Sequence, residues 1–197
     1  MFGGQTTDFI VVGIWNAGKE RYAEYFPRKP FDRLSEEQKQ AITTELSQGD
    51  PTLTEFSPNS DDYLNYIVKE IKPMIDQTYK VFTDPAHTRI AGSSMGGLIS
   101  WYAICEYPDI FGGAACLSTH WPGTFSAENN PIPSTSLEYL EVNLPDPNTH
   151  QIYFDCGNQT LDALYPAIQN DVDVLMVKRG YGSDNWQTRY FPGEDHS

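Results

Sequence analysis

Basic residues and long apolar stretches are both scarce in this sequence. Lysine and arginine number 13 against 27 aspartates and glutamates, so the formal net charge is −14. Such an excess of acid argues against nucleic acids and anionic membrane surfaces as partners. The acidic residues are scattered along the chain rather than grouped, which is typical of a solvated surface. No apolar run approaches the roughly 18 residues of a membrane span, and no signal peptide is visible at Met1.

Cysteines are few, and their number is odd. Cys105, Cys116 and Cys156 lack the spacing of a metal site, and we interpret them as small buried hydrophobic residues. A disulfide with one leftover thiol is the alternative. The chain of 197 residues is 39% hydrophobic, which is enough for one sizeable core. We therefore expect a single domain over residues 1–197. The sequence gives no indication of the cellular compartment.

Short apolar runs that alternate with helical patterns predict the strands. The first run, residues 9–14 (FIVVGI), is continuous and uncharged, which is typical of a strand buried on both faces of a parallel sheet. Similar runs follow at residues 88–91, 113–118, 151–155 and 188–191, and apolar stripes with helical spacing cover residues 64–75 and 164–176. This alternation predicts an α/β fold with a mostly parallel sheet of about five strands and helices on both faces.

One segment, at about residues 28–59, interrupts the alternation. It is rich in Pro, Asp and Ser, and it contains a short predicted helix that begins with the capping box of Ser35 and Gln38. A long excursion from the end of a strand often forms a cap or rim over a site. A solvated surface insertion is the alternative, and the sequence favours neither.

The most informative stretch is Gly92-Ser93-Ser94-Met95-Gly96, which fits the pattern G-x-S-x-G. In a nucleophile elbow of this kind, a serine occupies a sharp turn between a strand and a helix, and the glycines allow close backbone approach. The predicted strand before the motif and the helical pattern after it supply that context. We therefore expect Ser94, not Ser93, to be a nucleophile, with the Met95 N–H as an oxyanion donor. A merely structural turn is the alternative.

The direction of the sheet separates the four histidines. Chemistry in a parallel sheet gathers at the carboxyl ends of the strands. His87 and His150 precede their strands and are expected at the opposite edge, whereas His120 and His196 follow theirs. His196, after the last strand, is the predicted general base. His120 and the adjacent Trp121 are predicted as pocket walls, with the indole offering a flat surface to an acyl or aromatic group.

The acid that orients this base is expected between Ser94 and His196, near the end of the penultimate strand. Asp155 and Asp162 both qualify. Asp155 sits on the strand itself, whereas Asp162 follows a loop and can turn toward His196, so we prefer Asp162. Its role would be to hold the imidazole tautomer and to stabilise the imidazolium. Asp195 is adjacent to His196, and neighbouring side chains rarely face each other in the required way.

Several of these motifs resemble one known family. Similarity to the putative-esterase family of the α/β-hydrolase superfamily is carried by residues 90–98 (IAGSSMGGL), Asp155-x-Gly157, Thr160-x-Asp162 and Gly193-x-x-His196. The family groups esterase D-like enzymes, feruloyl and acetyl esterases, trilactone siderophore esterases and mycolyltransferases. Residues 13–16 (GIWN), with Arg21 after them, resemble the strand and loop that these enzymes carry upstream of the elbow. Asn16 and Arg21 are therefore assigned to the substrate pocket.

The resemblance implies a Ser94–Asp162–His196 triad and no metal or organic cofactor. It also implies that a small-molecule carboxylic ester is hydrolysed through an acyl-enzyme. The second oxyanion donor would be a backbone N–H near Trp15 or Asn16, or one from a further strand of the family. Acyl transfer to an alcohol or sugar would use the same residues. A non-catalytic binding module would keep the same fold, and both alternatives stay open.

The sequence also departs from the family pattern. Members carry further strands before residues 9–14, and one of these lies between residues 9–14 and residues 88–91. Without it two buried strand edges are unpaired, and each orphaned backbone group costs about 1–3 kcal/mol. We expect a fragment of a longer esterase that associates with itself through the bare edge, with His196 loosely held near the terminus. A compact variant with rearranged strand pairing is the alternative.

Overall fold

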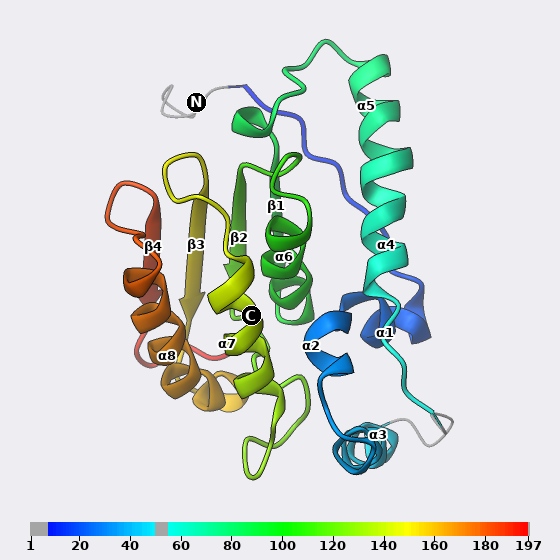
Figure 1. Cartoon of the computed structure of the whole chain (residues 1–197), viewed down its shortest axis with the longest axis vertical. Helices are drawn as coiled ribbons and strands as arrows, with labels where there is room; N and C mark the ends of the chain where they lie inside the picture. Colours follow the sequence, from blue (N-terminus) through cyan, green and yellow to red (C-terminus); the bar gives the residue numbers. More distant parts are fainter. Residues whose placement is uncertain (1–7, 50–54, 197) are drawn as a thin grey trace.

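Within the described residues, 8–49 and 55–196, this computed structural model contains one parallel sheet of four strands in the order β1-β2-β3-β4. The strands are β1 Arg89–Ser93, β2 Gly113–Leu117, β3 Gln151–Cys156 and β4 Trp186–Tyr190. Their first residues lie side by side, Arg89 next to Gly113 and Gly113 next to Gln151. The carboxyl ends of the strands therefore meet at one edge of the sheet (Figure 1).

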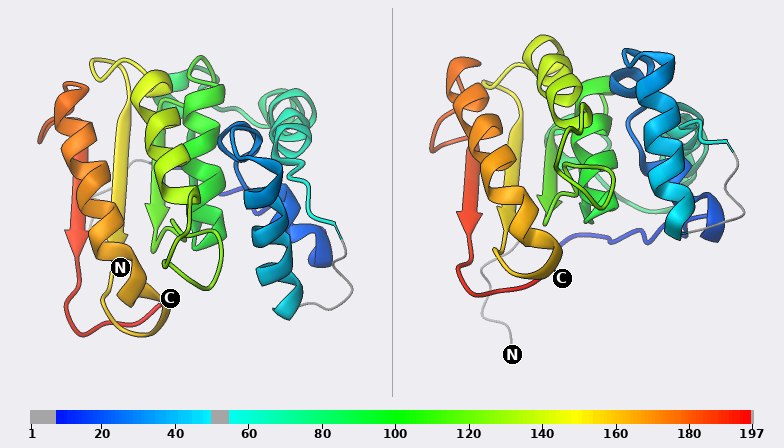
Figure 2. Two further views of the ribbon diagram at one scale, coloured as in Figure 1. Left: turned by 60° about the horizontal axis from the view of Figure 1, so that its bottom comes forward. Right: turned by 90° about the horizontal axis from the view of Figure 1, so that it is seen from below.

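Three long helices connect these strands. They are α6 Met95–Glu106 after β1, α7 Ile132–Asn143 after β2 and α8 Tyr165–Lys178 after β3. All three lie on the same face of the sheet (Figure 1 and Figure 2), because right-handed crossovers between strands that are neighbours in order pass over the same side. The sequence predicted helices on both faces of the sheet, and the three connecting helices cover one of these faces.

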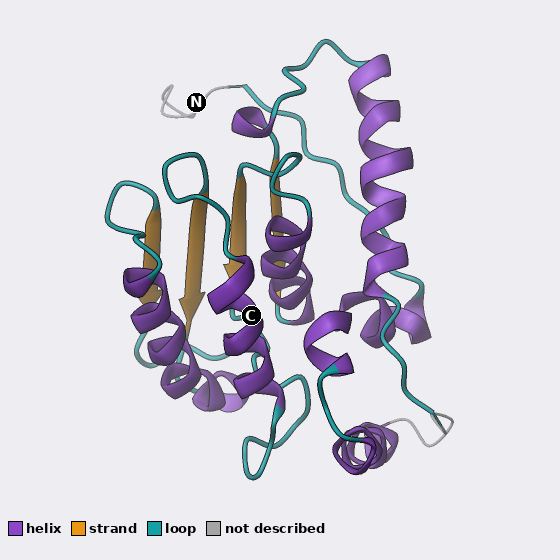
Figure 3. Cartoon of the chain, viewed as in Figure 1, coloured by secondary structure: helices purple, strands orange, loops and turns teal. Residues whose placement is uncertain are grey.

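Further helices precede β1 (Figure 3). They are η1 Gly18–Glu20, α1 Arg21–Tyr25, α2 Arg28–Asp32, α3 Glu36–Gly49, α4 Ser60–Tyr66, η2 Ile67–Ile71, α5 Lys72–Thr78 and η3 Pro85–His87, and a further short helix, η4 Thr160–Leu164, precedes α8. The turn η2 is π-helical and joins α4 to α5 in one continuous column.

The excursion at residues 28–59 corresponds largely to α2 and α3, although residues 50–54 lie outside the described part. The predicted capping box is confirmed: Ser35 N–H donates to Gln38 Oε1 at 2.9 Å, and Gln38 N–H donates to Ser35 Oγ at 3.3 Å. Phe31 of α2 packs edge-on against Phe26 and Phe56, with ring centroids 5.6 and 5.5 Å away. This aromatic cluster anchors the excursion in the hydrophobic core.

The predicted first strand is wrong. Residues 9–14 are extended but belong to no strand, and Phe9 and Val11 are 73% and 78% exposed. A strand exists only where a neighbour accepts and donates its backbone hydrogen bonds, and among the described residues β1 pairs with β2 alone. The described residues therefore form four strands where the sequence predicted about five.

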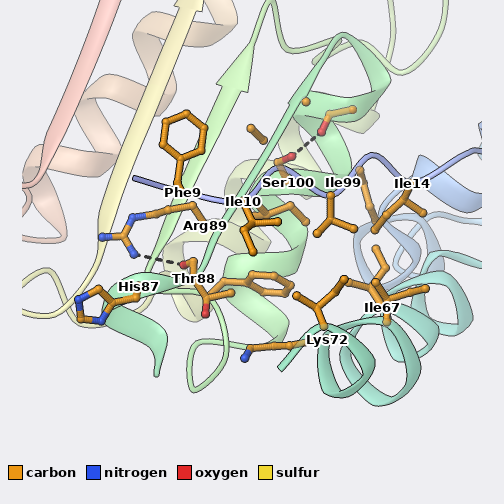
Figure 4. Close-up of a pocket in the computed structure, with 18 of the residues that line it drawn as sticks. Phe9, Ile10, Ile14, Ile67, Lys72, His87, Thr88, Arg89, Ile99 and Ser100 are labelled. Atoms are coloured by element: carbon orange, nitrogen blue, oxygen red, sulfur yellow. Dashed lines mark hydrogen bonds between the residues drawn. The ribbon is translucent and has the colours of Figure 1, made fainter. Parts of the chain in front are cut away.

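A pocket of about 1080 Å³ separates this extended segment from β1. Figure 4 shows Phe9, Ile10 and Ile14 on one side of it and Ile67 of the helical column on another. Its lining also includes β1 residues from Arg89 to Ser93. The pocket thus runs along the outer edge of the sheet, on the side of β1 that faces away from β2.

The prediction for the cysteines is confirmed. Cys105, Cys116 and Cys156 are free and buried, and burial raises the pKa of the Cys156 thiol to about 12. They act as small apolar side chains of the core. Over the described residues, the structure contains no helix with the length and apolar character needed to cross a membrane.

Candidate active site

Ser94 lies on the sharp turn between β1 and α6, as the motif predicts. Its backbone has φ 61° and ψ −119°, a strained conformation for a residue with a side chain, and its N–H donates to the Leu117 carbonyl at 2.9 Å. Met95 is the first residue of α6, where backbone N–H groups have no acceptor within the helix. The turn therefore combines a side-chain hydroxyl with the positive end of a buried helix.

The glycines of the motif have different roles. A Cβ at Gly92 would lie 2.5 Å from the carbonyl oxygen of Gly96, so the crossing of β1 over α6 admits only glycine there. A Cβ at Gly96 would meet nothing within 4 Å. A Cβ at Gly97 would lie 2.8 Å from Thr119 Oγ1. Close backbone approach thus requires Gly92, while the next tight position is Gly97 rather than Gly96.

Asp162 and His196 form a close pair. Asp162 Oδ1 lies 2.6 Å from His196 Nδ1, and the carboxylate is fully buried. An ionised carboxylate can only accept, so Nδ1 carries the proton and Nε2 is left as an acceptor. The second carboxylate oxygen, Oδ2, accepts from Gly157 N–H at 2.6 Å and from Ser118 Oγ at 2.9 Å.

The loop around His196 is held by further hydrogen bonds. The His196 N–H donates to Thr160 Oγ1 at 3.1 Å, and the Glu194 carbonyl accepts from the N–H groups of Asn158 and Gln159 at 3.0 Å. His196 is therefore anchored to the loop that carries Asp162, rather than loosely held as the sequence suggested.

Ser94 and His196 border the same loop after β2 but make no hydrogen bond with each other in the described part of the chain. The Ser94 carbonyl accepts from His120 N–H at 3.2 Å, and Ser118, two residues earlier, bonds Asp162. The structure thus brings Asp162 and His196 into contact. Ser94 contacts the same loop, which follows β2, through His120.

Asp155, the alternative acid, has other partners. Its Oδ1 accepts from Ser118 N–H at 3.0 Å, and its Oδ2 accepts from the Tyr153 hydroxyl at 2.9 Å. It makes no hydrogen bond or ion pair with a histidine among the described residues. Asp155 lies on β3 and faces the backbone just after the end of the neighbouring strand, β2.

His120 is buried, with 1% of its surface exposed. Its Nδ1 lies 2.7 Å from the Tyr165 hydroxyl, and its Nε2 has no hydrogen-bond partner among the described residues. Burial, with the nearby His196, lowers the pKa of His120 to about 4, so the ring is neutral at pH 7. The ring of Tyr165 lies edge-on to both His120 and His196, with centroids 5.8 Å away in each case.

Trp121 lies in the core rather than in a pocket wall, which corrects the sequence-based assignment. Its ring stacks on Trp101 with centroids 5.9 Å apart, and its Nε1–H donates to Gln169 Oε1 at 2.9 Å. The indole is 1% exposed, so no face of it is open to a ligand. The stretch after β2 turns inward beneath α6 and α8 instead of lining the surface.

The residues predicted upstream of the elbow lie on an extended stretch and the start of α1. Trp15 is 95% exposed and makes no hydrogen bond with the elbow among the described residues. Asn16 Oδ1 accepts from Gly18 N–H at 2.9 Å, which closes the turn before η1. Arg21 lies over the Tyr25 ring at 5.5 Å and makes no ion pair within the described residues.

The remaining two histidines lie at the opposite edge, as predicted from the sheet direction. His87 contacts Asp84 at 2.8 Å, and His150 Nε2 lies 2.9 Å from the Pro108 carbonyl. Sequence reasoning missed Ser118 and Tyr165, both of which contact the proposed site. Ser118 stands at the carboxyl end of a predicted strand next to the elbow, and that position is the signal that could have revealed it.

A family model described as "Putative esterase" matches residues 17–197. The chain belongs to this family. A curated relative, the uncharacterized protein YbbA of Bacillus subtilis (strain 168), is 28% identical over 106 residues, which are 54% of this chain and 38% of that protein.

Solved structures share the α/β-hydrolase-type fold of the family. An IroE-like serine hydrolase from Shewanella oneidensis superposes with a TM-score of 0.64 at 17% identity, over 90% of this chain and 52% of that chain. The enterobactin esterase FES from Shigella flexneri superposes with a TM-score of 0.52 at 20% identity, over 69% of this chain and 34% of that chain. A ferulic acid esterase has a TM-score of 0.50 at 22% identity, over 66% of this chain and 52% of that chain. The chain thus spans about a third to a half of these proteins.

Over the described residues, no group of three or more His, Cys, Asp or Glu side chains gathers in a way that could hold a metal ion. The polar groups of the candidate site are instead a hydroxyl, an imidazole and a carboxylate. This is the set used in nucleophilic acyl transfer.

Proposed function

We propose that the protein is a serine esterase that hydrolyses a small-molecule carboxylic ester through a Ser94–Asp162–His196 triad. The observation that carries this proposal is the contact of the buried Asp162 with His196, with 2.6 Å between Oδ1 and Nδ1, in a chain whose Ser94 occupies a strained elbow. Membership of the putative esterase family and the likeness to serine hydrolases support the reaction class.

In the proposed acylation step, Ser94 Oγ attacks the ester carbonyl carbon while His196 Nε2 takes the hydroxyl proton. The buried Asp162 stabilises the imidazolium that forms and keeps the proton on Nδ1. His196 then gives its Nε2 proton to the leaving alkoxide, and the acyl group stays on Ser94. Water attacks the acyl-enzyme in the second step, with His196 again as the base.

The negative charge on the carbonyl oxygen needs donors that are in place before the reaction. The Met95 N–H at the start of α6 is the proposed first donor, and a backbone N–H near Trp15 or Asn16 is the proposed second. Loss of one such donor typically lowers the rate by about 10²–10³.

Arg21 is the proposed contact for a charged part of the substrate. It is half-buried at the start of α1 and makes no ion pair among the described residues, in a chain with twice as many acidic as basic residues. A guanidinium without a carboxylate partner is suited to an anionic or strongly polar group. Asn16 lies in the turn before it and is proposed as a second polar contact.

Labelling with a fluorophosphonate tests the nucleophile directly. We expect the wild type to be labelled at Ser94, with no label on Ser93 in the peptide map, and to hydrolyse p-nitrophenyl acetate. Ser94→Ala should lose both labelling and turnover and keep the folded circular-dichroism spectrum. Undiminished turnover by Ser94→Ala would rule out the proposed nucleophile.

Transfer and hydrolysis can be separated with the same substrate. If water is the acceptor, adding a primary alcohol leaves the rate of p-nitrophenol release and the yield of free acid unchanged. If the enzyme is an acyltransferase, the alcohol diverts the acyl group into a new ester. A wild type that folds but neither labels nor turns over would indicate a binding module.

A further inference from the structure

The carboxylate of Asp162 is held on both of its oxygens. Oδ1 faces His196, while Oδ2 accepts from Gly157 N–H and from the Ser118 hydroxyl at 2.6 and 2.9 Å. Ser118 and Asp162 are both buried, so no solvent competes for these bonds. Hydrogen bonds to an ionised acceptor are stronger than bonds between neutral groups.

Ser118 is itself held in an unfavourable conformation. Its φ is 38°, in the left-handed region that residues with a side chain rarely adopt. Its N–H donates to Asp155 Oδ1 at 3.0 Å, and the other oxygen of Asp155 accepts from the Tyr153 hydroxyl. Asp155 thus anchors the backbone of Ser118, and the turned backbone aims the hydroxyl at Asp162.

We propose that Ser118 is a positioning residue of the esterase, held by Asp155, whose hydroxyl turns the Asp162 carboxylate so that Oδ1 faces His196 Nδ1. This inference rests on the proposed function. The hydroxyl gives its one proton to Oδ2, which is then occupied by two donors. The lone pairs of Oδ1 remain for the imidazole.

Burial keeps three other ionisable groups around the pair, those of His120, Cys156 and Tyr165, uncharged near neutral pH. Burial lowers the pKa of His120 to about 4 and raises that of Cys156 to about 12. Burial also raises the pKa of Tyr165 above its usual range. The Arg21 guanidinium stays charged. Glu194 and Asp195 on the last loop are exposed carboxylates.

Ser118→Ala and Ser118→Gly together test the hydroxyl. Both remove the donor to Asp162, but only glycine relieves the backbone strain. A carboxylate with fewer donors is the stronger base and holds the protonated imidazole more firmly. We therefore expect the acid limb of the plot of kcat/KM against pH to shift to higher pH by about half to one pH unit in both variants. We also expect kcat to fall about tenfold with KM unchanged.

Ser136→Ala is the matched control, because Ser136 is a buried serine on α7 that makes no hydrogen bond with Asp162 or His196 in the described part of the chain. It should leave the acid limb and kcat at their wild-type values. Asp155→Asn keeps an oxygen for the Ser118 N–H and should lower kcat only slightly, whereas Asp155→Ala removes that acceptor and should show part of the Ser118→Ala effect.

An acid limb that stays at the wild-type pH in both Ser118 variants would overturn the inference, even if kcat falls, because a general loss of packing lowers the rate at every pH. Recovery of the wild-type profile by Ser118→Gly would also overturn it and would assign the effect to the backbone.

Fluorophosphonate labelling of Ser94 is measured on the same samples. Labelled enzyme with an unmoved limb refutes the role of Ser118 alone, whereas an unlabelled, inactive wild type refutes the proposed function and this inference with it.

Discussion

Asp155 and Asp162 carry the same functional group seven positions apart, and their surroundings give them different tasks. Asp162 is fully buried and bonds an imidazole, a hydroxyl and a backbone N–H. Asp155 bonds a backbone N–H and a phenol at the end of β3. The first arrangement can fix the tautomer of a base, whereas the second can only fix a strand end.

Exchanging each acid for its amide separates these tasks. Asp162→Asn replaces one acceptor oxygen with a donor and favours the wrong tautomer of His196, so kcat should fall by about 10⁴, as in the well-studied serine protease triad. Asp155→Asn keeps an acceptor for Ser118 and should lower kcat only slightly. Steady-state kinetics on p-nitrophenyl acetate measures both, and a larger loss in Asp155→Asn would reassign the acid.

His120 makes folding sensitive to pH. Burial lowers its pKa from 6.5 to about 4 in the folded protein. Between these values the unfolded chain binds a proton that the folded protein does not, so the free energy of unfolding decreases as the pH falls. We expect His120 to contribute a loss of about 2.5 kcal/mol in the free energy of unfolding from pH 7.5 to pH 4.5.

Urea unfolding of the wild type and of His120→Gln at these two pH values tests this origin. Glutamine does not titrate, so the variant should lose about 2.5 kcal/mol less stability on acidification than the wild type. Its stability at pH 7.5 can differ for packing reasons, which the comparison across pH removes. An equal pH dependence in both proteins would assign the acid sensitivity to other groups.

At the scale of elements, the crossing of β1 and α6 sets the shape of the elbow. The end of the strand and the start of the helix lie so close that Gly92 touches the backbone of Gly96. A Cβ at Gly92 would lie only 2.5 Å from the Gly96 carbonyl oxygen. Gly96 itself has open space where a Cβ would point. The two glycines of the motif are therefore not equivalent.

Alanine substitution should reveal this difference. Gly92→Ala forces β1 and α6 apart and should destabilise the protein by about 3 kcal/mol or more, with loss of Ser94 labelling. Gly96→Ala should be tolerated or should stabilise the protein by up to about 1 kcal/mol, because alanine is the better helix former. Thermal unfolding measures both. Equal destabilisation by the two substitutions would contradict the contact that separates them.

At the scale of the whole molecule, the outer edge of β1 is the unusual surface. β1 is an edge strand that pairs only with β2 among the described residues, and its outer edge borders a pocket of about 1080 Å³. The apolar segment at residues 9–14 lies exposed across that pocket. Unpaired edges and exposed apolar segments favour pairing with a second chain.

We therefore expect the protein to self-associate through this edge. Val11→Lys places a charge on the exposed segment and should shift the protein toward monomer in sedimentation velocity. Val177→Lys is the matched control, since Val177 is 64% exposed on α8 and Val11 is 78% exposed. Both substitutions make the net charge less negative by one, so repulsion between copies does not explain a difference.

Ionic strength gives a second test of association. Copies with a net charge of −14 repel one another, and salt screens this repulsion, so the associated fraction should rise with salt. A wild type that stays monomeric at high protein concentration and high salt would refute association. Dissociation by Val177→Lys to the same extent as by Val11→Lys would place the contact elsewhere.

Local patterns in the sequence were enough to predict the elbow, the order of the alternating elements and the edge of the sheet at which chemistry gathers. Each of these depends on residues close together in the chain: glycines around Ser94, the capping box at Ser35, or the position of a histidine before or after its strand. The preference for Asp162 over Asp155 came from the same local reasoning, because a residue beyond a strand can turn where a residue on it cannot.

Tertiary structure decided whatever depends on a partner distant in sequence. Residues 9–14 have every local feature of a buried strand and are not one, because backbone hydrogen bonds need a neighbouring strand and none of the described residues supplies it. Trp121 was predicted to face a ligand and instead stacks on Trp101, since the packing of α6 against the β2 loop is invisible in either segment alone. Ser118 was overlooked for the same reason: its role depends on Asp155 and Asp162, which lie on the next strand and the loop after it.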